Sequence, residues 1–102
     1  MASRLNLHEE LCEILGSRYV YFQPPESLKL NHPCIIYKLL SPNVKKADNI
    51  NYMVTKQYRV IVVDSDPDSE IPDNIMKHFN LLTMTDPYTS DGMYHYVFNL
   101  YY

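Results

Sequence analysis

The sequence is poor in glycine and cysteine, lacks tryptophan and carries no excess of positive charge. Its 102 residues include two glycines and two cysteines, and the formal net charge is −3 at pH 7. Two glycines cannot build the glycine-rich loop that cradles phosphate groups. A net negative chain also lacks the basic surface by which proteins grip nucleic acid. The composition therefore argues against a nucleotide-binding loop and against tight binding to DNA.

Long apolar runs and a signal sequence are also missing. No stretch approaches the roughly 20 apolar residues that span a membrane, and the first residues turn polar and acidic too soon for a secretory signal. We therefore expect cytoplasmic synthesis and no membrane partner. Cys12 and Cys34 are expected to be buried thiols in a reducing compartment, with a disulfide between helix and strand as the alternative. The length predicts a single domain, residues 1–102.

Tyrosine and proline are abundant by contrast, with ten tyrosines and seven prolines. Alternation near the C-terminus predicts a strand whose apolar face comprises Tyr94, Tyr96, Phe98, Leu100 and Tyr102. Such a strand must be held in a sheet, because its aromatic side chains would otherwise be exposed and prone to associate. The pattern indicates a compact sheet protein that lies against something else.

The first part of the chain predicts an amphipathic helix over Leu5–Leu15. Asn6 is expected to cap this helix, and Glu9, three residues later, to complete a capping box. Gly16 is expected to end the helix. The apolar stripe comprises Leu7, Leu11, Ile14 and Leu15.

Strands are expected in the middle of the chain. Tyr19–Phe22 predicts a short strand, which two consecutive prolines end, and a loop is expected from there to Pro33. The uniformly apolar run Cys34–Leu40 predicts a central strand with both faces at least partly covered. Residues 41–51 have no apolar period and predict a long excursion or a hairpin loop, and Tyr52–Val63 is expected to be the longest strand.

In the last third, residues 64–69 predict a turn, and Ser69 is expected to cap a second helix. The buried stripe of that helix comprises Ile71, Ile75, Phe79 and Leu82. An extended piece near residues 82–88 is expected to pair with the final strand through a hairpin turn at Asp91-Gly92. This order of elements predicts an α+β fold, in which a mostly antiparallel sheet has two helices packed on one face.

The acidic run from Asp64 to Glu70 is the strongest candidate for a metal site, because calcium loops carry carboxylates at alternate positions. Counted from Asp64, however, the glycine position of a calcium loop is Ser69 and its essential glutamate position is Ile75. Acidic residues are also favoured where a strand turns into a helix, because they complement the unsatisfied backbone N–H groups there. We therefore expect a structural turn and no metal.

Nothing in the sequence predicts a catalytic site or a cofactor. The four histidines, His8, His32, His78 and His95, lack metal-ligand spacing. Neither cysteine stands in a pattern that would activate it as a nucleophile. We expect the protein not to be an enzyme.

The sequence favours contacts between subunits over catalysis as the role of its surface residues. Long structureless loops in small domains are often functional, and tyrosine is favoured at interfaces because it offers a large contact area at low entropy cost. The pair Lys45-Lys46 is either a solvated loop tip or part of an insertion that reaches a neighbouring subunit. The candidate subunit-interface residues are Lys45, Lys46, Asp48, Asn49, Tyr52, Tyr101 and Tyr102.

Several segments together resemble a known family. They are the first helix with Gly16, residues 20–25, 33–37, 47–49, 52, 58–64 and 66–69, and the ending over residues 95–102. Over nearly the whole chain, these segments are similar to small proteins of the head–tail joining region of tailed bacteriophages and prophages. Those are the tail-completion and tail-terminator proteins of long-tailed, siphovirus-like phages.

The resemblance implies an α+β fold and a homo-oligomeric ring, commonly six-fold, that caps the tail tube and joins it to the head connector proteins. DNA would pass through the lumen without specific binding, and a net negative charge suits such a conduit. The expected location is the virion, at the head–tail interface. The alternatives are a head-side connector or stopper subunit and, from a different class, a small α+β ligand-binding regulatory domain.

Overall fold

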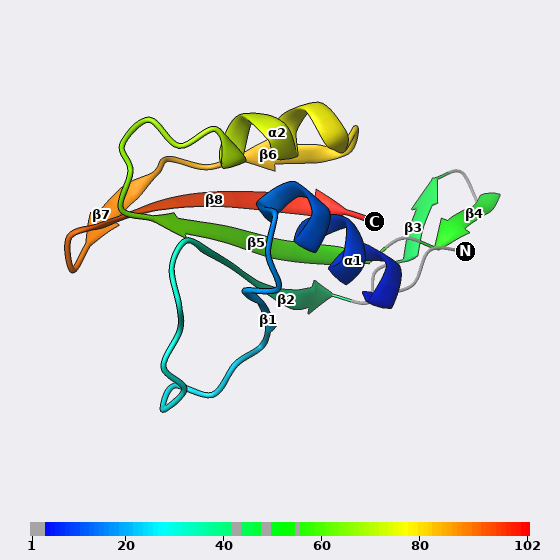
Figure 1. Ribbon diagram of the computed structural model, residues 1–102. Helices are drawn as coiled ribbons and strands as arrows, with labels where there is room; N and C mark the ends of the chain where they lie inside the picture. Colours follow the sequence, from blue (N-terminus) through cyan, green and yellow to red (C-terminus); the bar gives the residue numbers. More distant parts are fainter. Residues whose placement is uncertain (1–3, 42–43, 48–49, 55) are drawn as a thin grey trace.

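Two helices lie over one face of a twisted sheet, and a separate hairpin stands at one end of it (Figure 1). The computed structural model describes residues 4–41, 44–47, 50–54 and 56–102. The elements in chain order are α1 (Arg4–Leu15), β1 (Val20–Phe22), β2 (Cys34–Ser41), β3 (Val44–Ala47), β4 (Ile50–Val54), β5 (Gln57–Asp64), α2 (Ile71–His78), β6 (Leu82–Met84), β7 (Tyr88–Ser90) and β8 (Met93–Tyr101).

The main sheet has the strand order β1-β2-β5-β8-β6, and β7 pairs with another part of β8. Strand β1 runs parallel to β2, and every other pair in this sheet is antiparallel. Strand β5 is the centre, because it pairs along nearly its whole length with β2 on one side and β8 on the other. The fold is α+β with a mostly antiparallel sheet, as predicted.

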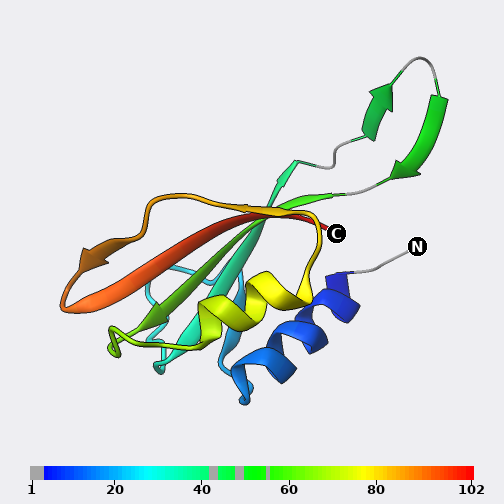
Figure 2. The same cartoon turned by 90° about the horizontal axis from the view of Figure 1, so that it is seen from above.

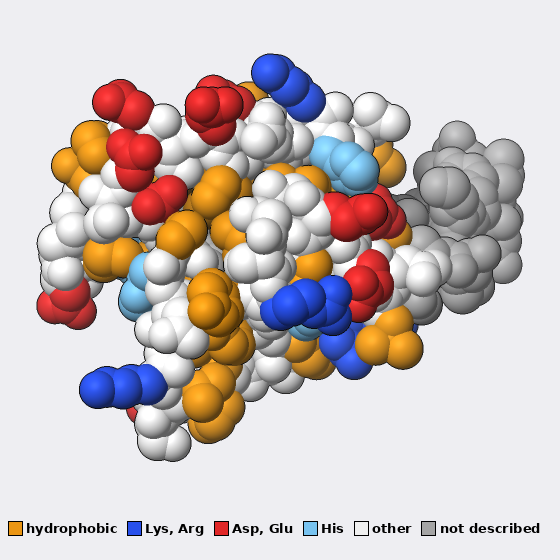
Figure 3. Space-filling model, in the orientation of Figure 1, with side chains coloured by type: hydrophobic (Ala, Val, Ile, Leu, Met, Phe, Trp, Pro, Cys, Tyr) orange, Lys and Arg blue, Asp and Glu red, His pale blue; other side chains and the backbone are white. Residues whose placement is uncertain are grey.

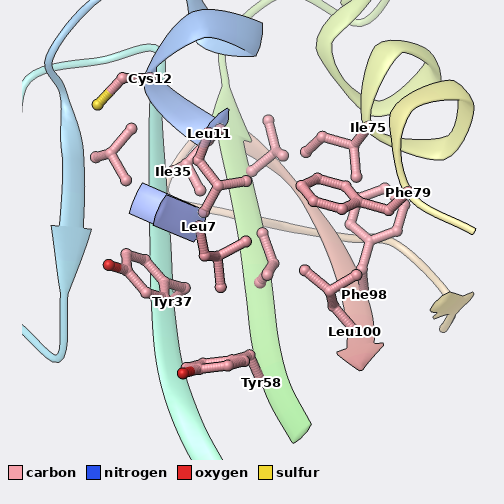
Figure 4. Packing of buried hydrophobic residues seen from close by; sticks show 13 residues of the cluster. Leu7, Leu11, Cys12, Ile35, Tyr37, Tyr58, Ile75, Phe79, Phe98 and Leu100 are labelled. Carbon is pink, nitrogen blue, oxygen red and sulfur yellow. The ribbon is translucent and has the colours of Figure 1, made fainter. Parts of the chain in front are cut away.

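Both helices cover the same face of the main sheet, as Figure 2 shows from above. Alternate residues of the three long strands point toward the helices, so that Ile35, Val60 and Phe98 meet Leu7 of α1 and Ile75 of α2 in one core (Figure 4). All five are at most 1% exposed. The predicted stripe of the first helix is confirmed, and so is the inward face of the C-terminal strand from Tyr96 to Tyr102, whereas Tyr94 lies outside the cluster.

The N-terminal helix begins earlier than expected. Because α1 starts at Arg4, Asn6 lies inside its first turn and the predicted capping box is wrong. Glu9 instead forms a two-pronged ion pair with Arg18, whose Nη1 and Nη2 lie 2.9 Å and 3.0 Å from the two carboxylate oxygens. Gly16 does end the helix as predicted, with φ at 83° and its N–H donating to the carbonyl of Cys12.

The second helix is shorter than its apolar stripe suggested. Its N-cap is Glu70 and not Ser69, although the Ser69 hydroxyl still accepts a hydrogen bond from the N–H of Ile71 at 3.3 Å. The helix ends before Phe79, so Phe79 and Leu82 are not helical. Both still contribute to the core, because the chain turns back onto the sheet as β6.

The long strand predicted over Tyr52–Val63 is wrong, because the structure divides it into β4 and β5. Strand β4 pairs with β3, so the long excursion or hairpin loop expected over residues 41–51 contains strands that the sequence did not predict. Lys56 lies between the two strands. In a continuous strand its side chain would point to the same face as those of the buried Tyr58 and Val60. A lysine is costly to bury, so the inward-facing alternation cannot continue through it.

Candidate functional site

The β3–β4 hairpin is the most prominent surface feature. It extends beyond the end of the main sheet, between β2 and β5, in both Figure 1 and Figure 2. Within the described ranges it shares no strand pairing with the main sheet and forms a two-stranded sheet of its own. An isolated two-stranded hairpin is marginally stable in water. This element therefore gains most from contact with another protein surface.

The hairpin brings together part of the predicted interface. Lys45 and Lys46 lie on β3 and Tyr52 lies on β4, with Lys46 paired to Asn51. The predicted Asp48 and Asn49 lie outside the described residues. Tyr101 and Tyr102 lie at the end of β8, and Tyr101 is the register partner of Gln57, the first residue of β5. All the described interface candidates thus gather at one end of the main sheet.

The Tyr102 side chain makes contacts within its own chain. Its hydroxyl donates to the Glu10 carboxylate, and the other Glu10 oxygen lies 2.6 Å from Nε2 of His78. The Tyr102 ring also meets Phe79 edge-on, with 6.1 Å between ring centroids. Burial, followed by the bond to Glu10, raises the pKa of Tyr102 to about 12. Tyr102 therefore joins the end of β8 to both helices, whereas Tyr101 points to the opposite face of the sheet.

That opposite face, which the helices leave open, carries a polar row that the sequence analysis missed. Lys38 of β2 is the register partner of Arg59 on β5, and Arg59 is the register partner of Asn99 on β8. Nε of Arg59 and Oδ1 of Asn99 are buried and have no hydrogen-bond partner in the described part of the chain. Like charges directly opposite each other destabilise a strand pair, so a bound anion would stabilise Lys38 and Arg59.

Coverage of this open face decreases from Cys34 to Lys38 along β2. Cys34 is fully buried, Ile36 is half-buried and Lys38 is exposed. The expectation that both faces of this strand are at least partly covered is therefore met, with the coverage of the open face present at Cys34 and absent at Lys38. The sequence does place one cation inside each of two apolar runs, Lys38 in β2 and Arg59 in β5. Only the strand pairing shows that these two cations are adjacent.

A hollow of about 550 Å³ lies beside this row. Its walls include Gln23, Pro24, Ile36, Lys38, Arg59 and Ile61, so two cations and no acidic residue line it. Gln23 has φ at 45°, and its side-chain oxygen accepts a hydrogen bond from the N–H of Leu39 at 3.2 Å. A positive φ is uncommon for a residue other than glycine. The hydrogen bond fixes this wall of the hollow.

The acidic loop between β5 and α2 forms a structural turn, as expected. Asp64 is only 8% exposed, and its Oδ1 accepts from the N–H of Asp66 at 3.1 Å. Oδ1 of Asp66 in turn accepts from the N–H of Asp68 at 2.9 Å. Figure 3 shows acidic side chains gathered over this loop and the start of α2. No cluster of His, Cys, Asp and Glu that could hold a metal ion occurs among the described residues.

The thiols lie in settings that disfavour the thiolate. Both cysteines are free and buried, which is the arrangement expected from the sequence. Burial raises the pKa of Cys34 to about 11 and also raises the pKa of Cys12. The thiolate is the nucleophilic form, so neither cysteine is prepared for nucleophilic chemistry at neutral pH.

The histidines serve contacts between elements. Nδ1 of His8 lies 2.8 Å from the Tyr37 hydroxyl, and burial, with the cations Arg18 and Arg4, lowers the pKa of His8. His95 stacks on Tyr88 with 4.6 Å between ring centroids. These arrangements join helix to sheet and strand to strand.

Two comparisons with known proteins leave the chain without a match. A scan against protein-family models finds no model that fits it, and a search of curated proteins finds no matching relative. Within the described ranges, no helix has the length and apolar character needed to cross a membrane. Function is therefore inferred from the sequence and from the geometry of the described residues.

Proposed function

We propose that the protein is a structural subunit of a homo-oligomeric ring at the head–tail junction of a long-tailed bacteriophage. It acts there as a tail-terminator or tail-completion protein. The observation that carries this proposal is the β3–β4 hairpin, which stands off the main sheet as a separate two-stranded unit. A neighbouring copy supplies the contact that such a hairpin lacks in the isolated chain.

The edges of the main sheet favour the hairpin over edge-to-edge strand pairing as the means of association. Strands β1, β6 and β7 have three residues each. Short edge strands discourage pairing with another chain. Contacts through the hairpin are head-to-tail when it reaches a different surface of the next copy, and head-to-tail contacts that close form rings.

The phage assignment is supported by the resemblance over nearly the whole chain. The ring would cap the tail tube, meet the head connector and let DNA pass through its lumen. Such a part works by completing contacts and needs no catalytic residue. The net charge of −3 suits a conduit that must not retain phosphate groups.

The test is the oligomeric state of the full chain and of a variant without the hairpin. Ser41 and Gln57 are already register partners in β2 and β5, so an Asn-Gly turn can replace residues 42–56 and join the two strands. Native mass spectrometry of the full chain is expected to show a ring of defined copy number. The variant is expected to be a folded monomer, with its fold checked by circular dichroism.

Two results would contradict the proposal. One is a full chain that stays monomeric at high concentration, and the other is a hairpin-free variant that still forms the ring.

The hollow on the open face favours the alternative of a ligand-binding regulatory domain. That function predicts a monomer or dimer whose thermal midpoint rises when a small ligand is added.

A further inference from the structure

The open face of the main sheet has cations without counterions. Within the described residues, neither Lys38 nor Arg59 takes part in an ion pair, and Nε of Arg59 is buried without an acceptor. The hollow beside them has no acidic wall, and next to the cations, one row along the same face, it presents the apolar side chains of Ile36 and Ile61, which are register partners of each other. Arginine suits carboxylates because its planar group donates in a fork. This surface therefore fits an acidic segment that also carries apolar atoms.

The acidic loop has the complementary pattern. Asp66 and Asp68 are exposed, and Pro67 lies between them. The backbone bonds of the loop use Oδ1 of Asp66, and no described residue binds the Asp68 carboxylate. Two exposed carboxylates beside an apolar proline ring are complementary in charge and polarity to two cations beside an apolar floor.

The two surfaces lie too far apart to meet within one copy. Arg59 is near the start of β5, and Asp64 ends that strand five residues later. At about 3.3 Å per residue, the separation along the strand is roughly 16 Å before the loop begins. A rigid central strand therefore keeps the loop from reaching Lys38 and Arg59 of its own chain. Contact between these surfaces has to join different copies.

We propose that the open face of the main sheet binds the acidic loop of a second copy of this chain, with Lys38 and Arg59 receiving Asp66 and Asp68. This inference rests on the proposed ring and identifies one of its contacts. The contact is head-to-tail, because a face of one copy meets a loop of the next, and repeated contacts of this kind close into a ring. It also places opposite charges together in a chain whose net charge would otherwise oppose assembly.

Complementary variants test the contact. The face variant carries Lys38→Glu and Arg59→Glu, and the loop variant carries Asp66→Asn and Asp68→Lys. Asparagine at position 66 can still accept the backbone bond that shapes the turn. Each variant alone is expected to associate at least about thirtyfold more weakly than the unaltered chain. An equimolar mixture is expected to recover association as mixed dimers or larger species, because one variant keeps the native face and the other the native loop.

Controls separate loss of contact from loss of fold. Lys77→Glu reverses an exposed charge on α2, away from both surfaces, and is expected to assemble as the unaltered chain does. Thermal unfolding reports whether each variant is folded. If the face variant does not fold, carbodiimide cross-linking of the unaltered assembly is expected to join Lys38 to Asp66 or Asp68 between copies. Absence of that cross-link, while other lysine–carboxylate cross-links form, would overturn the contact.

The outcomes distinguish this contact from the ring itself. An unaltered chain that never associates would defeat both proposals. A ring that persists in the folded face and loop variants would overturn only this contact. Failure of the mixed variants to recover association would overturn it as well.

Discussion

Glu10 is the residue at which three distant parts of the chain meet. It lies on α1. One of its carboxylate oxygens lies 2.6 Å from Nε2 of His78 on α2, and the other accepts a hydrogen bond from the Tyr102 hydroxyl. Hydrogen bonds to a charged group are stronger than neutral ones. Nothing in the spacing of the predicted helix indicated that Glu10 has a partner 92 residues away.

At this scale we predict different effects for two adjacent tyrosines. Tyr102→Phe removes the bond to Glu10 and is expected to lower the free energy of unfolding by about 1–2 kcal/mol at pH 7. Tyr101→Phe is the matched control, because the Tyr101 hydroxyl has no hydrogen bond to any described residue. Its effect is expected to stay within about 0.5 kcal/mol. Urea denaturation measures both, and equal losses would contradict the assignment.

The burial of Tyr102, together with the same bond, predicts a dependence on alkaline pH. The pKa of Tyr102 in the folded chain is about 12, above its usual value of 10.0. Its contribution to stability is therefore fully present below pH 10 and is lost as the pH rises through about 12. Urea denaturation from pH 9 to 12 is expected to show a smaller alkaline loss for Tyr102→Phe than for Tyr101→Phe. Identical alkaline profiles would count against the burial of Tyr102 and its bond to Glu10.

At the scale of elements, the turn between β7 and β8 follows from the backbone preferences of two residues. Asp91 and Gly92 both have positive φ, at 53° and 74°. This is the arrangement of a type I′ turn, for which Asp-Gly is a strong signal. The sequence therefore predicted this hairpin correctly, and Met93 follows as the first residue of β8.

We predict that backbone strain alone sets the stability cost of a substitution in this turn. Gly92→Ala is expected to cost about 1 kcal/mol, because an L side chain is strained at positive φ. No atom lies within 4 Å of the added Cβ, so a steric clash contributes nothing. Asp91→Asn is the control and is expected to be nearly neutral, because asparagine favours the same turn. Urea denaturation compares the two, and a neutral Gly92→Ala would show that the turn has another conformation.

At the scale of the whole molecule, one core joins both helices to the main sheet. Leu7 of α1, Ile75 of α2 and Phe98 of β8 belong to a single buried cluster. Loss of packing in one element therefore weakens the others. The hairpin forms a separate sheet, and its removal is expected to leave this core in place.

Two leucines on α1 test the shared core. Leu7 is 0% exposed and Leu5 is 65% exposed. Leu7→Ala is expected to cost about 2–5 kcal/mol, because it leaves a cavity in the core, and Leu5→Ala should stay within about 0.5 kcal/mol. Far-ultraviolet circular dichroism and the near-ultraviolet signal of the tyrosines should report one common transition. Separate transitions would show that the helices and the sheet unfold independently.

The sequence by itself determined features that depend on near neighbours. Alternation identified the inward face of β8, and Gly16 identified the end of α1. These predictions succeeded because side-chain periodicity and backbone sterics act over a few residues. Over residues 41–51 the sequence indicated a long excursion or a hairpin loop and missed β3, and it also joined β4 to β5 and placed the caps of both helices incorrectly.

Only the tertiary structure decided which strands are neighbours and in what register. The alignment of Lys38, Arg59 and Asn99 depends on pairings across β2, β5 and β8. The bond between Glu10 and Tyr102 likewise depends on the docking of α1 beside the end of β8. These arrangements arise from burial of a common core by segments far apart in the chain. Local periodicity places a residue on a face of its strand, but the packing of that core selects the residue beside it.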